Sequence, residues 1–470
     1  MITTISPIDN KECFRCKKTP LEIINNRLNS MVIAQKTWKN TQITERINIL
    51  NRFLEEIKLQ TDFISNRLTI EMGRPIKYCT SEISGLLSRA EKMIQISHTI
   101  LLENNFENKT HLQTKIKREP LGIVLIIPAW NYPYLISINT LIPALLSGNA
   151  VVFKNSSQTP TVGNIYESCL KKAGLPEDLF LNIYTDHYMA GQIVADSRIN
   201  YVAFTGSFRG GRLIVSQANN YRLNGINNQP SLGFKPVTLE LGGKDPAYVC
   251  EDANLKICAA EIADGCFFNS GQCCCAVERV YVHKNVYNKF IELVKKHAES
   301  LVLGNPLDYK TTLGPMTKYG SADIIRNKVK NAINKGAKQI VDQSNFHLST
   351  IGSNYMAPQI LINVNHDMEI MTEETFGPVM PIMKVENDEE AIKLMNDSKY
   401  GLTASVWTRD LEKGERICNQ IETGTVFVNR CDYLDPELAW TGVKETGMGC
   451  SLSYLAYYHL TRPKSYYMRT

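Results

Sequence analysis

The sequence has little of what would tie it to a membrane, to nucleic acid or to the outside of a cell. Its most apolar stretch, residues 135–153, is interrupted by Asn139, Pro143 and Asn149, so it suits a buried helix running into a strand better than a membrane span. The chain begins without the charged and then apolar leader of a secreted protein. Lysine and arginine (52) are scattered among aspartate and glutamate (47), and the formal charge of +5 favours neither nucleic acid nor a membrane surface as a partner.

A recognisable metal-binding pattern is also missing. The 8 histidines form no HExxH pair. Cys13 and Cys16 have the spacing of a zinc knuckle, but no second Cys or His pair follows at ligand distance, so we expect no metal site. The 13 cysteines of a chain without a secretory leader are expected to be reduced thiols in a cytoplasmic protein.

The chain does contain the material for a large globular protein. Its 470 residues, 43% hydrophobic and 21% charged, exceed what one ordinary core organises, so we expect two or three domains. Apolar residues recur at helical spacing over residues 21–32 and 43–57, which predicts amphipathic helices and a helical first part of the chain. Residues 111–118 alternate and the apolar run 121–127 follows, which predicts two strands, the second fully buried.

From there, strand-like and helix-like segments alternate, which is typical of a parallel α/β architecture. The predicted strands are residues 150–154, 200–205, 237–241, 379–385 and 424–428, and the predicted helices are residues 162–172, a segment from Gly210, and residues 287–301 and 322–335. The tail, residues 465–469, has the pattern of an edge strand. The Asn-rich segment 219–229 is the one compositionally biased stretch, and we expect it on the surface.

Three adjacent cysteines, Cys273, Cys274 and Cys275, end the segment FFNSGQCCC and form the densest chemical signal. A thiol becomes a useful nucleophile where its pKa is lowered or a base lies near. For an isolated cysteine the usual alternative is a small side chain that only fills a core. Three further segments favour chemistry over packing here.

These three segments place polar groups where strands end. IIPAWNYP sets Asn131 just after a buried strand, where its amide can donate to a developing oxyanion. LELGGKDP sets Glu240 at another strand end, before two glycines that let a backbone approach closely. FTGSFRGG sets glycines between a strand and a helix, so the helix N-terminus could face a pyrophosphate, although the Lys-Ser/Thr ending of a P-loop is missing. Each motif alone is weak evidence, because turns also use Gly, Asn and Glu. The interpretation depends on the presence of all these motifs in this order.

With these residues the chain resembles the aldehyde dehydrogenase superfamily along nearly its whole length. The matching segments are IIPAWNYP, VVFKNSSQTP, FTGS, LELGGKDP, FFNSGQCCC, EETFGPV and TGVKETGMG. The resemblance implies an α/β fold with a Rossmann-type nucleotide-binding domain (residues 1–103 and 121–240), an α/β catalytic domain (241–451) and a small β bridging element (104–120 and 452–470). Bridging strands in relatives extend the sheet of a neighbouring subunit, so a homodimer or homotetramer is expected.

The resemblance also implies the oxidation of an aldehyde to the carboxylic acid. Cys274 would attack the carbonyl carbon, while the Asn131 side chain and the Cys274 backbone N–H hold the oxyanion. Hydride transfer to the cofactor would leave a thioester, which Glu240 would hydrolyse by activating water. An ordinary strand-end salt bridge is the alternative reading of Glu240.

NAD or NADP is the cofactor that the resemblance implies. Lys154 matches the adenosine-ribose contact, Ser207 lies on the pyrophosphate side, and Glu374 and Phe376 match the residues that position the nicotinamide ribose and ring. The full set of expected cofactor residues is Trp130, Lys154, Ser157, Gly206, Ser207, Leu241, Gly242, Glu374 and Phe376. NAD-preferring relatives often carry a glutamate where Ser157 stands, and without that charge to repel a 2′-phosphate we expect NADP to be accepted.

The expected substrate follows from what the pocket lacks. Relatives that oxidise succinic semialdehyde hold its carboxylate with two arginines, and the corresponding residues here are Asn139 and Phe268, which offer no bidentate cation. Together with Tyr132, Leu434 and Trp440 they form an aromatic and apolar wall. The sequence therefore predicts a preference for uncharged medium-chain or aromatic aldehydes.

Departures from the family pattern leave alternatives open. Residues 439–442 read Ala-Trp-Thr-Gly where relatives usually have Pro-Phe-Gly-Gly, and Ser451 stands where many relatives carry a second glutamate that helps to relay protons. A semialdehyde dehydrogenase is the alternative if an arginine from elsewhere, such as Arg430, enters the substrate tunnel. A CoA-acylating relative is disfavoured because such enzymes generally lack the carboxylate of Glu240, and a non-catalytic binding protein because the fold alone does not require this set of residues.

Overall fold

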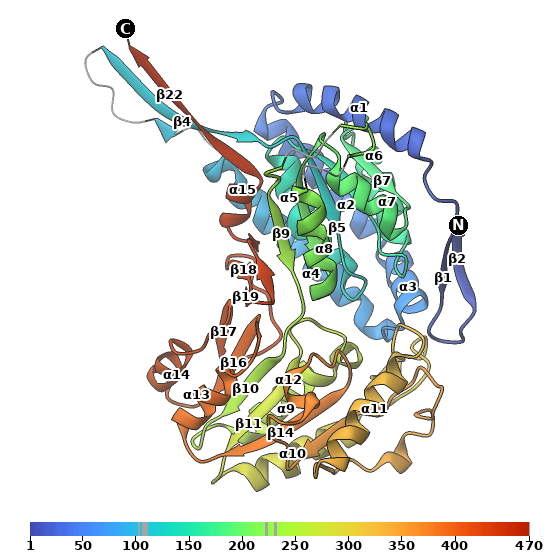
Figure 1. Ribbon diagram of the computed structural model, residues 1–470, viewed down its shortest axis with the longest axis vertical. Helices are drawn as coiled ribbons and strands as arrows, with labels where there is room; N and C mark the ends of the chain where they lie inside the picture. Colours follow the sequence, from blue (N-terminus) through green and yellow to red (C-terminus); the bar gives the residue numbers. More distant parts are fainter. Residues whose placement is uncertain (102–103, 106–110, 221–223, 230–232, 470) are drawn as a thin grey trace.

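Two lobes and a projecting ribbon make up the protein, in a computed structural model that describes residues 1–101, 104–105, 111–220, 224–229 and 233–469. The first lobe is blue to green in Figure 1, and the second is yellow to orange. Parts of the predicted bridging segment 104–120 and of the Asn-rich segment 219–229 lie outside the described residues. No described helix is both long enough and apolar enough to cross a membrane.

A six-stranded sheet forms the centre of the first lobe, in the order β20-β9-β8-β5-β6-β7. The strands are β5 (Ile123–Ile127), β6 (Ala150–Lys154), β7 (Phe180–Ile183), β8 (Ile199–Thr205), β9 (Val237–Glu240) and β20 (Gly447–Met448). All pair in parallel except β20, which lies antiparallel to β9. The chain builds one half of the sheet outward from β5 and then returns to place β8 on its other side. This reversal is the topological switch point at which such sheets bind ligands.

Helices surround this sheet because their apolar residues recur at helical spacing. They are α1 (Leu21–Trp38), α2 (Ile43–Leu59), α3 (Thr61–Met72), α4 (Ile76–Ile100), α5 (Pro133–Leu146), α6 (Thr161–Lys172), α7 (His187–Ala195) and α8 (Phe208–Asn219). The first part of the chain is not wholly helical as the sequence predicted: a hairpin of β1 (Ile2–Ile5) and β2 (Glu12–Cys16) precedes α1. Its strands are short and half-exposed, so their alternation is too brief to stand out from a loop.

The second lobe is built on a seven-stranded sheet, in the order β12-β13-β14-β11-β10-β16-β17. The strands are β10 (Asp245–Val249), β11 (Val277–His283), β12 (Lys338–Gln339), β13 (Gln359–Ile362), β14 (Val379–Val385), β16 (Thr403–Trp407) and β17 (Thr425–Val428). The helices are α9 (Leu255–Phe267), α10 (Tyr287–Glu299), α11 (Ser321–Asn334), α12 (Glu369–Thr372), α13 (Asp388–Asn396) and α14 (Leu411–Cys418), with 3-10 turns at Phe268–Gly271 and Gln343–Asn345. The predicted parallel α/β architecture is confirmed.

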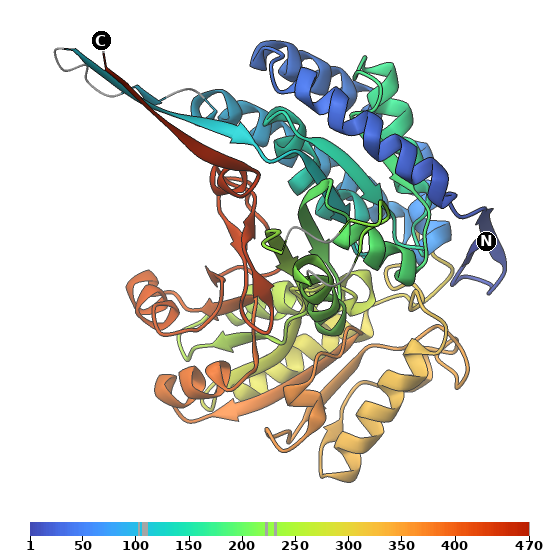
Figure 2. The same ribbon diagram turned by 45° about the horizontal axis from the view of Figure 1, so that its top comes forward.

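The ribbon consists of β4 (Leu112–Pro120) and β22 (Thr461–Arg469), which pair antiparallel along their whole length, with β3 (Asn104–Asn105) on the far side of β4. It projects away from both lobes in two views (Figures 1 and 2). The strand predicted at residues 465–469 therefore begins earlier, and the short helix α15 (Leu455–His459) precedes it. Four further short strands form two small two-stranded sheets. β15 (Tyr400–Gly401) pairs with β19 (Val443–Lys444), and β18 (Trp440–Thr441) pairs with β21 (Cys450–Ser451).

Candidate active site

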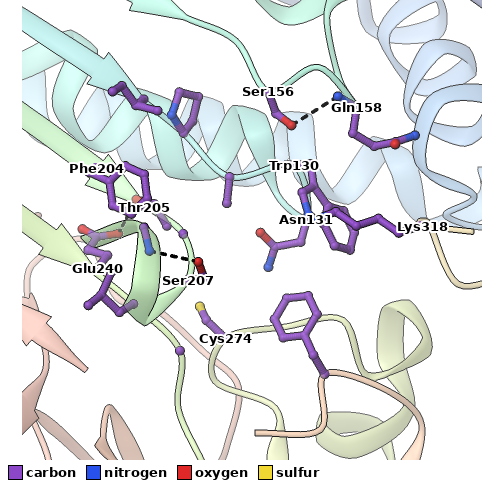
Figure 3. Close-up of a pocket in the computed structure, with 18 of the residues that line it drawn as sticks. Trp130, Asn131, Ser156, Gln158, Phe204, Thr205, Ser207, Glu240, Cys274 and Lys318 are labelled. Carbon is purple, nitrogen blue, oxygen red and sulfur yellow. Dashed lines mark hydrogen bonds between the residues drawn. The ribbon is translucent and has the colours of Figure 1, made fainter. Parts of the chain in front are cut away.

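A cleft of about 790 Å³ opens between the two lobes at the carboxyl ends of β5, β6, β8 and β9 (Figure 3). Its volume is in the range of small-molecule sites. The predicted residues that line it are Trp130, Asn131, Lys154, Ser157, Gly206, Ser207, Glu240, Leu241, Gly242, Cys274, Glu374 and Phe376. In Figure 3 the sulfur of Cys274 points into the cleft, with Asn131 on one side of it and Glu240 on the other.

The loop before Cys274 is bent by three consecutive left-handed residues. Residues 269–271 have φ angles of 52°, 58° and 68°, just after helix α9. Only glycine suits the third position, because a Cβ on Gly271 would lie 2.3 Å from the carbonyl oxygen of Gly377. The bend leaves Cys274 half-buried at the cleft while its two neighbouring cysteines are buried.

Cys274 also differs from the other cysteines in its acidity. Hydrogen bonds from the thiols of Cys273 and Cys275 lower the pKa of Cys274, against burial and the charge of Glu240. The pKa of each of the other twelve cysteines is raised, in most of them by burial. Since the thiolate is the reactive form, the cysteine at the cleft is the one whose environment favours nucleophilic attack.

A buried ion pair that sequence reasoning missed holds Asn131. Arg74 pairs with Glu82 of helix α4, and both side chains are almost fully buried. The Arg74 guanidinium donates to the carbonyl oxygen of Asn131 (2.5 Å), and Glu82 accepts from the backbone N–H of Tyr134 (2.8 Å) in the first turn of α5. The Asn131 amide donates to the carbonyl oxygen of Gln272 (3.2 Å), which leaves its second N–H for the cleft.

Glu240 ends strand β9 and is bonded on both carboxylate oxygens. The Ser451 hydroxyl donates to Oε1 (2.5 Å), and the Thr205 hydroxyl donates to Oε2 (3.4 Å). Burial raises the pKa of Glu240, although the hydrogen bonds of Ser451 and Thr205 and the charge of Arg89 oppose this. A carboxylate with a raised pKa is a better general base near neutral pH than an exposed one.

The other end of the cleft carries groups suited to a dinucleotide. Ser207 caps helix α8 by accepting from the backbone N–H of Gly210 (3.2 Å), so the N-terminus of this 12-residue helix opens toward the cleft. Lys154 is 8% exposed, and burial lowers its pKa. Its ammonium has no hydrogen-bond or ion-pair partner among the described residues, whereas buried charges are normally paired. Ser157 is exposed nearby at the same cleft.

Glu374 and Phe376 are held by a second buried ion pair that sequence reasoning missed. Lys244 pairs with Glu278 (2.7 Å), and the Glu278 carboxylate accepts from the backbone N–H groups of residue 375 and of Phe376, each at 2.8 Å. These bonds support the left-handed φ of 53° at Phe376, whose ring lies 5.7 Å from that of Trp130.

A close approach fixes Glu374 relative to strand β9. The backbone N–H of Gly243 donates to its carboxylate (3.2 Å), and a Cβ on Gly242 would lie 2.4 Å from both carboxylate oxygens. Only glycine at this position allows the approach. Burial, reinforced by the charge of Glu278, raises the pKa of Glu374.

The predicted substrate residues do not line this cleft in the described structure. The Arg74 guanidinium lies over the Tyr132 ring, 4.3 Å from the ring centroid, and the Phe268 ring lies 5.1 Å from that of Tyr78 at a tilt of 55°. The remaining three are placed as follows: Asn139 is buried and accepts from Arg89, Trp440 is buried in β18, and Leu434 packs partly buried against the core of the first lobe. Their role in binding substrate stays a prediction.

Weak signals for the missed residues exist in the sequence. Glu278 and Arg279 are adjacent charges inside the otherwise apolar strand β11, where every residue is buried. Glu82 and Arg89 lie seven residues apart on the buried face of α4. Charged residues at core positions are rarely tolerated without partners, so they mark internal ion pairs or sites.

A Rossmann-type sheet joined to a second α/β lobe across a ligand-sized cleft is the architecture of a nucleotide-binding enzyme. Comparison with known proteins narrows this class. The family model described as the aldehyde dehydrogenase family matches residues 1–466. Lactaldehyde dehydrogenase of Methanococcus maripaludis (strain C7) is 32% identical over 434 residues, 90% of this chain and 88% of the relative. The 4,4'-diapolycopene aldehyde oxidase of Methylomonas sp is 31% identical over 460 residues, 95% of this chain and 82% of the relative.

A solved structure agrees with these relatives. Succinic semialdehyde dehydrogenase from Streptococcus pyogenes, in complex with NADP+, superposes with a TM-score of 0.91 at 26% identity and covers 100% of both chains. The chain belongs to the aldehyde dehydrogenase family. These comparisons confirm the family and the aldehyde dehydrogenase-like α/β fold that the sequence predicted. They also confirm the predicted activity of the chain, the NAD(P)-dependent oxidation of an aldehyde.

Proposed function

We propose that Cys274 is the nucleophile of this dehydrogenase and that Asn131 stabilises the oxyanion. The observation that carries the proposal is the convergence of Cys274, Asn131 and Glu240 on one cleft from three separate segments of the chain. The Cys274 sulfur bonds to the carbonyl carbon, and the uncommitted N–H of Asn131 donates to the oxygen. A bound nicotinamide cofactor supplies the acceptor for the hydride that leaves this adduct, and a thioester on Cys274 remains.

Glu240 completes the proposed cycle by deacylation. Its carboxylate takes a proton from a water molecule, the oxygen of that water attacks the thioester carbon, and Cys274 leaves as a thiolate. The raised pKa of Glu240 supports this role, because burial increases its basicity. The test is formation of reduced cofactor from hexanal: the wild type should turn over, and Cys274→Ala should not. Turnover by Cys274→Ala at the wild-type rate would refute the mechanism.

The cleft has the residues to hold NAD or NADP. The ammonium of Lys154 would bind the adenosine ribose, the N-terminus of α8 beside Ser207 would bind the pyrophosphate, and Glu374 would hold the nicotinamide ribose. We propose that NADP is accepted, because the exposed side chain at Ser157 is neutral and lies beside Lys154 at the cleft. The Streptococcus pyogenes relative is itself a complex with NADP+.

For the substrate we propose an uncharged medium-chain or aromatic aldehyde. Asn139 and Phe268 replace the two arginines of the semialdehyde relatives, and Phe268 packs in an aromatic pair with Tyr78. The relative from Methylomonas is named 4,4'-diapolycopene aldehyde oxidase, and an aldehyde of this kind would suit the apolar wall that the sequence predicts.

A second candidate substrate class is a semialdehyde, and Arg89 is the observation in its favour. Arg89 is 9% exposed, and its Nη1 donates to the carbonyl of Leu135 (3.1 Å) and to Asn139 Oδ1 (3.3 Å). Its other guanidinium nitrogens have no partner among the described residues, and its charge acts on Cys274 and Glu240. An anionic group at the far end of a substrate would supply the missing partner.

Kinetics with three aldehydes separate the two classes. We expect higher kcat/KM for hexanal and benzaldehyde than for succinic semialdehyde. A preference for the semialdehyde that disappears in Arg89→Met would instead assign the second class. Arg430→Met is the matched control, because the Arg430 guanidinium lies 4.0 Å from the ring centroid of Tyr433, which is 43% exposed.

We also propose a homodimer or homotetramer in the cytoplasm. The ribbon supports assembly, because β22 is an edge strand and a projecting pair of strands is marginal on its own. All 13 cysteines are free thiols, which supports a reducing compartment. Assembly can be tested by comparing the sedimentation of the wild type with that of a chain truncated after Leu460. A monomeric wild type would contradict the proposal.

A further inference from the structure

Three adjacent thiols and one carboxylate gather around Cys274, the residue of this group that lines the cleft. The sulfurs of Cys273, Cys274 and Cys275 all lie within 4.8 Å of one another, and those of Cys273 and Cys275 are 3.4 Å apart. Asp432, which follows strand β17, brings one oxygen within 3.2 Å of the Cys273 sulfur and 3.0 Å of the Cys275 sulfur. The three sulfurs are therefore close enough to share an ion, and the Asp432 carboxylate contacts two of them.

The convergence has a local backbone cause. In a strand the side chains of neighbouring residues point to opposite faces, so three successive cysteines could not meet. Here the chain turns at residues 274–275 before strand β11 begins, and the backbone N–H of Ala276 donates to the carbonyl of Cys273 (3.3 Å). The turn folds the three side chains toward one another. Asp432 itself has a left-handed φ of 48°, a conformation that aspartate adopts more readily than most residues.

The spacing resembles that of a tetrahedral thiolate site. A zinc ion with Zn–S bonds of about 2.3 Å sets its sulfurs about 3.8 Å apart, and a carboxylate oxygen about 3.6 Å from each sulfur. The contacts of 3.4, 3.2 and 3.0 Å among Cys273, Cys275 and Asp432 are shorter than these edges by about half an ångström, and the Cys274 sulfur lies within 4.8 Å of the other two sulfurs. Small side-chain rotations would therefore admit an ion, without a change of backbone. Three soft sulfurs with one oxygen favour zinc or cadmium over magnesium or calcium.

We propose that Cys273, Cys274 and Cys275 form a binding site for a thiophilic divalent cation, which this sequence was not expected to hold, and that the Asp432 carboxylate, in contact with two of the three sulfurs, supports it. Binding displaces the thiol protons to solvent, so that the thiolates become the ligands and the Asp432 carboxylate stays against two of them. Cys274 opens the site to the cleft, and Cys273 and Cys275, 6% and 2% exposed, close it from behind. Because one ligand is the proposed nucleophile, a bound ion inhibits turnover reversibly. This last consequence rests on the proposed function, whereas the site itself does not.

Cadmium titration of the reduced, chelator-treated enzyme tests the site by a signal that does not depend on activity. Cadmium–thiolate charge transfer absorbs in the ultraviolet, and we expect it to saturate at one ion per chain with release of protons. Turnover should fall in parallel and return on addition of a chelator. Cys273→Ser, Cys275→Ser and Asp432→Asn should each weaken binding, at least tenfold for the two cysteine variants. The double variant Cys13→Ser/Cys16→Ser, on strand β2, is the control and should titrate like the wild type.

The outcomes separate the site from the mechanism. Absence of the charge-transfer band in the wild type would overturn the proposal, and so would equal affinity in the Cys273→Ser/Cys275→Ser double variant. A band that saturates without loss of turnover would support the site and count against Cys274 as the nucleophile. If Cys13→Ser/Cys16→Ser removes the band, the ion binds at the hairpin and the proposal fails.

Discussion

Ser451 donates its hydroxyl hydrogen to Glu240 Oε1 at 2.5 Å, across the junction of the two lobes. Ser451 lies on β21, opposite Trp440 of β18, so the main-chain pairing of two short strands fixes its position. Where many relatives carry a second glutamate, this chain has a neutral hydroxyl that orients and stabilises the carboxylate. A fixed hydrogen bond to an ionised acceptor is stronger than one between neutral groups.

Removal of that donor should shift the pH dependence of turnover. The Ser451 hydrogen bond lowers the pKa of Glu240 against the effect of burial, so Ser451→Ala should raise that pKa further. Glu240 acts as a base in its ionised form, and activity should therefore fall on the acidic side and recover as pH rises. A loss of roughly tenfold in kcat at acidic pH corresponds to one hydrogen bond to a charged group. A pH profile of kcat checks this, with Ser300→Ala, an exposed hydroxyl on α10's C-terminal turn, as control.

The two cysteines beside the nucleophile should be dispensable for chemistry. Cys273→Ala and Cys275→Ala are expected to retain most of the turnover at alkaline pH, whereas Cys274→Ala abolishes it. At acidic pH each flanking variant should lose activity, because the thiols of Cys273 and Cys275 lower the pKa of Cys274. Comparable losses at all three positions across the whole pH range would mean that the triplet is structural. The measurement is the initial rate of cofactor reduction against pH.

Glu240→Gln should separate the two halves of the reaction. If Glu240 serves deacylation, the thioester still forms but is hydrolysed very slowly. Rapid mixing should then give a burst of reduced cofactor of about one equivalent per active site, followed by slow turnover. An unaltered steady rate without a burst would contradict the role assigned to this carboxylate.

Cofactor preference should follow the charge at residue 157. Ser157→Glu places a carboxylate beside Lys154, at the position where it would repel a 2′-phosphate. We expect kcat/KM with NADP to fall at least tenfold and that with NAD to change little. Lys154→Met, by contrast, should weaken both cofactors. The idea fails if the wild type does not use NADP where it uses NAD, or if the ratio is the same in the variant.

Sequence patterns predicted the elements that carry strong local signals. The strands at residues 150–154 and 379–385 coincide with β6 and β14, because runs of buried β-branched and apolar residues are bounded by turn signals. The N-terminal hairpin was missed, since residues in β1 and β2 are too few and too polar to establish a period. The tail strand begins at Thr461 rather than at residue 465, and it includes Pro463. A proline usually counts against a strand, but an edge strand such as β22 tolerates it.

The residues of the candidate site could likewise be predicted only where the sequence signal is local. Asn131, Glu240 and Cys274 stand in motifs and could be found one segment at a time. The partners that hold them could not, because Arg74 lies 57 residues from the carbonyl of Asn131, and Asp432 lies 159 residues from Cys273. A charged residue in an apolar segment signals that some partner exists but does not say which one.

The lobes are joined by two crossings of the chain that lie side by side. The first leaves β9 after Glu240, the second enters β20 at Gly447, and these two residues pair in register. Leu241 donates its backbone N–H to the Thr446 carbonyl (2.8 Å), so the two crossings form one hydrogen-bonded connection beside β9, which we call the strap (Figure 1). A rotation of one lobe against the other would have its axis along this strap. Points on an axis do not move, so Glu240 would keep its place while Lys154, three strands away across the sheet, would move relative to the second lobe.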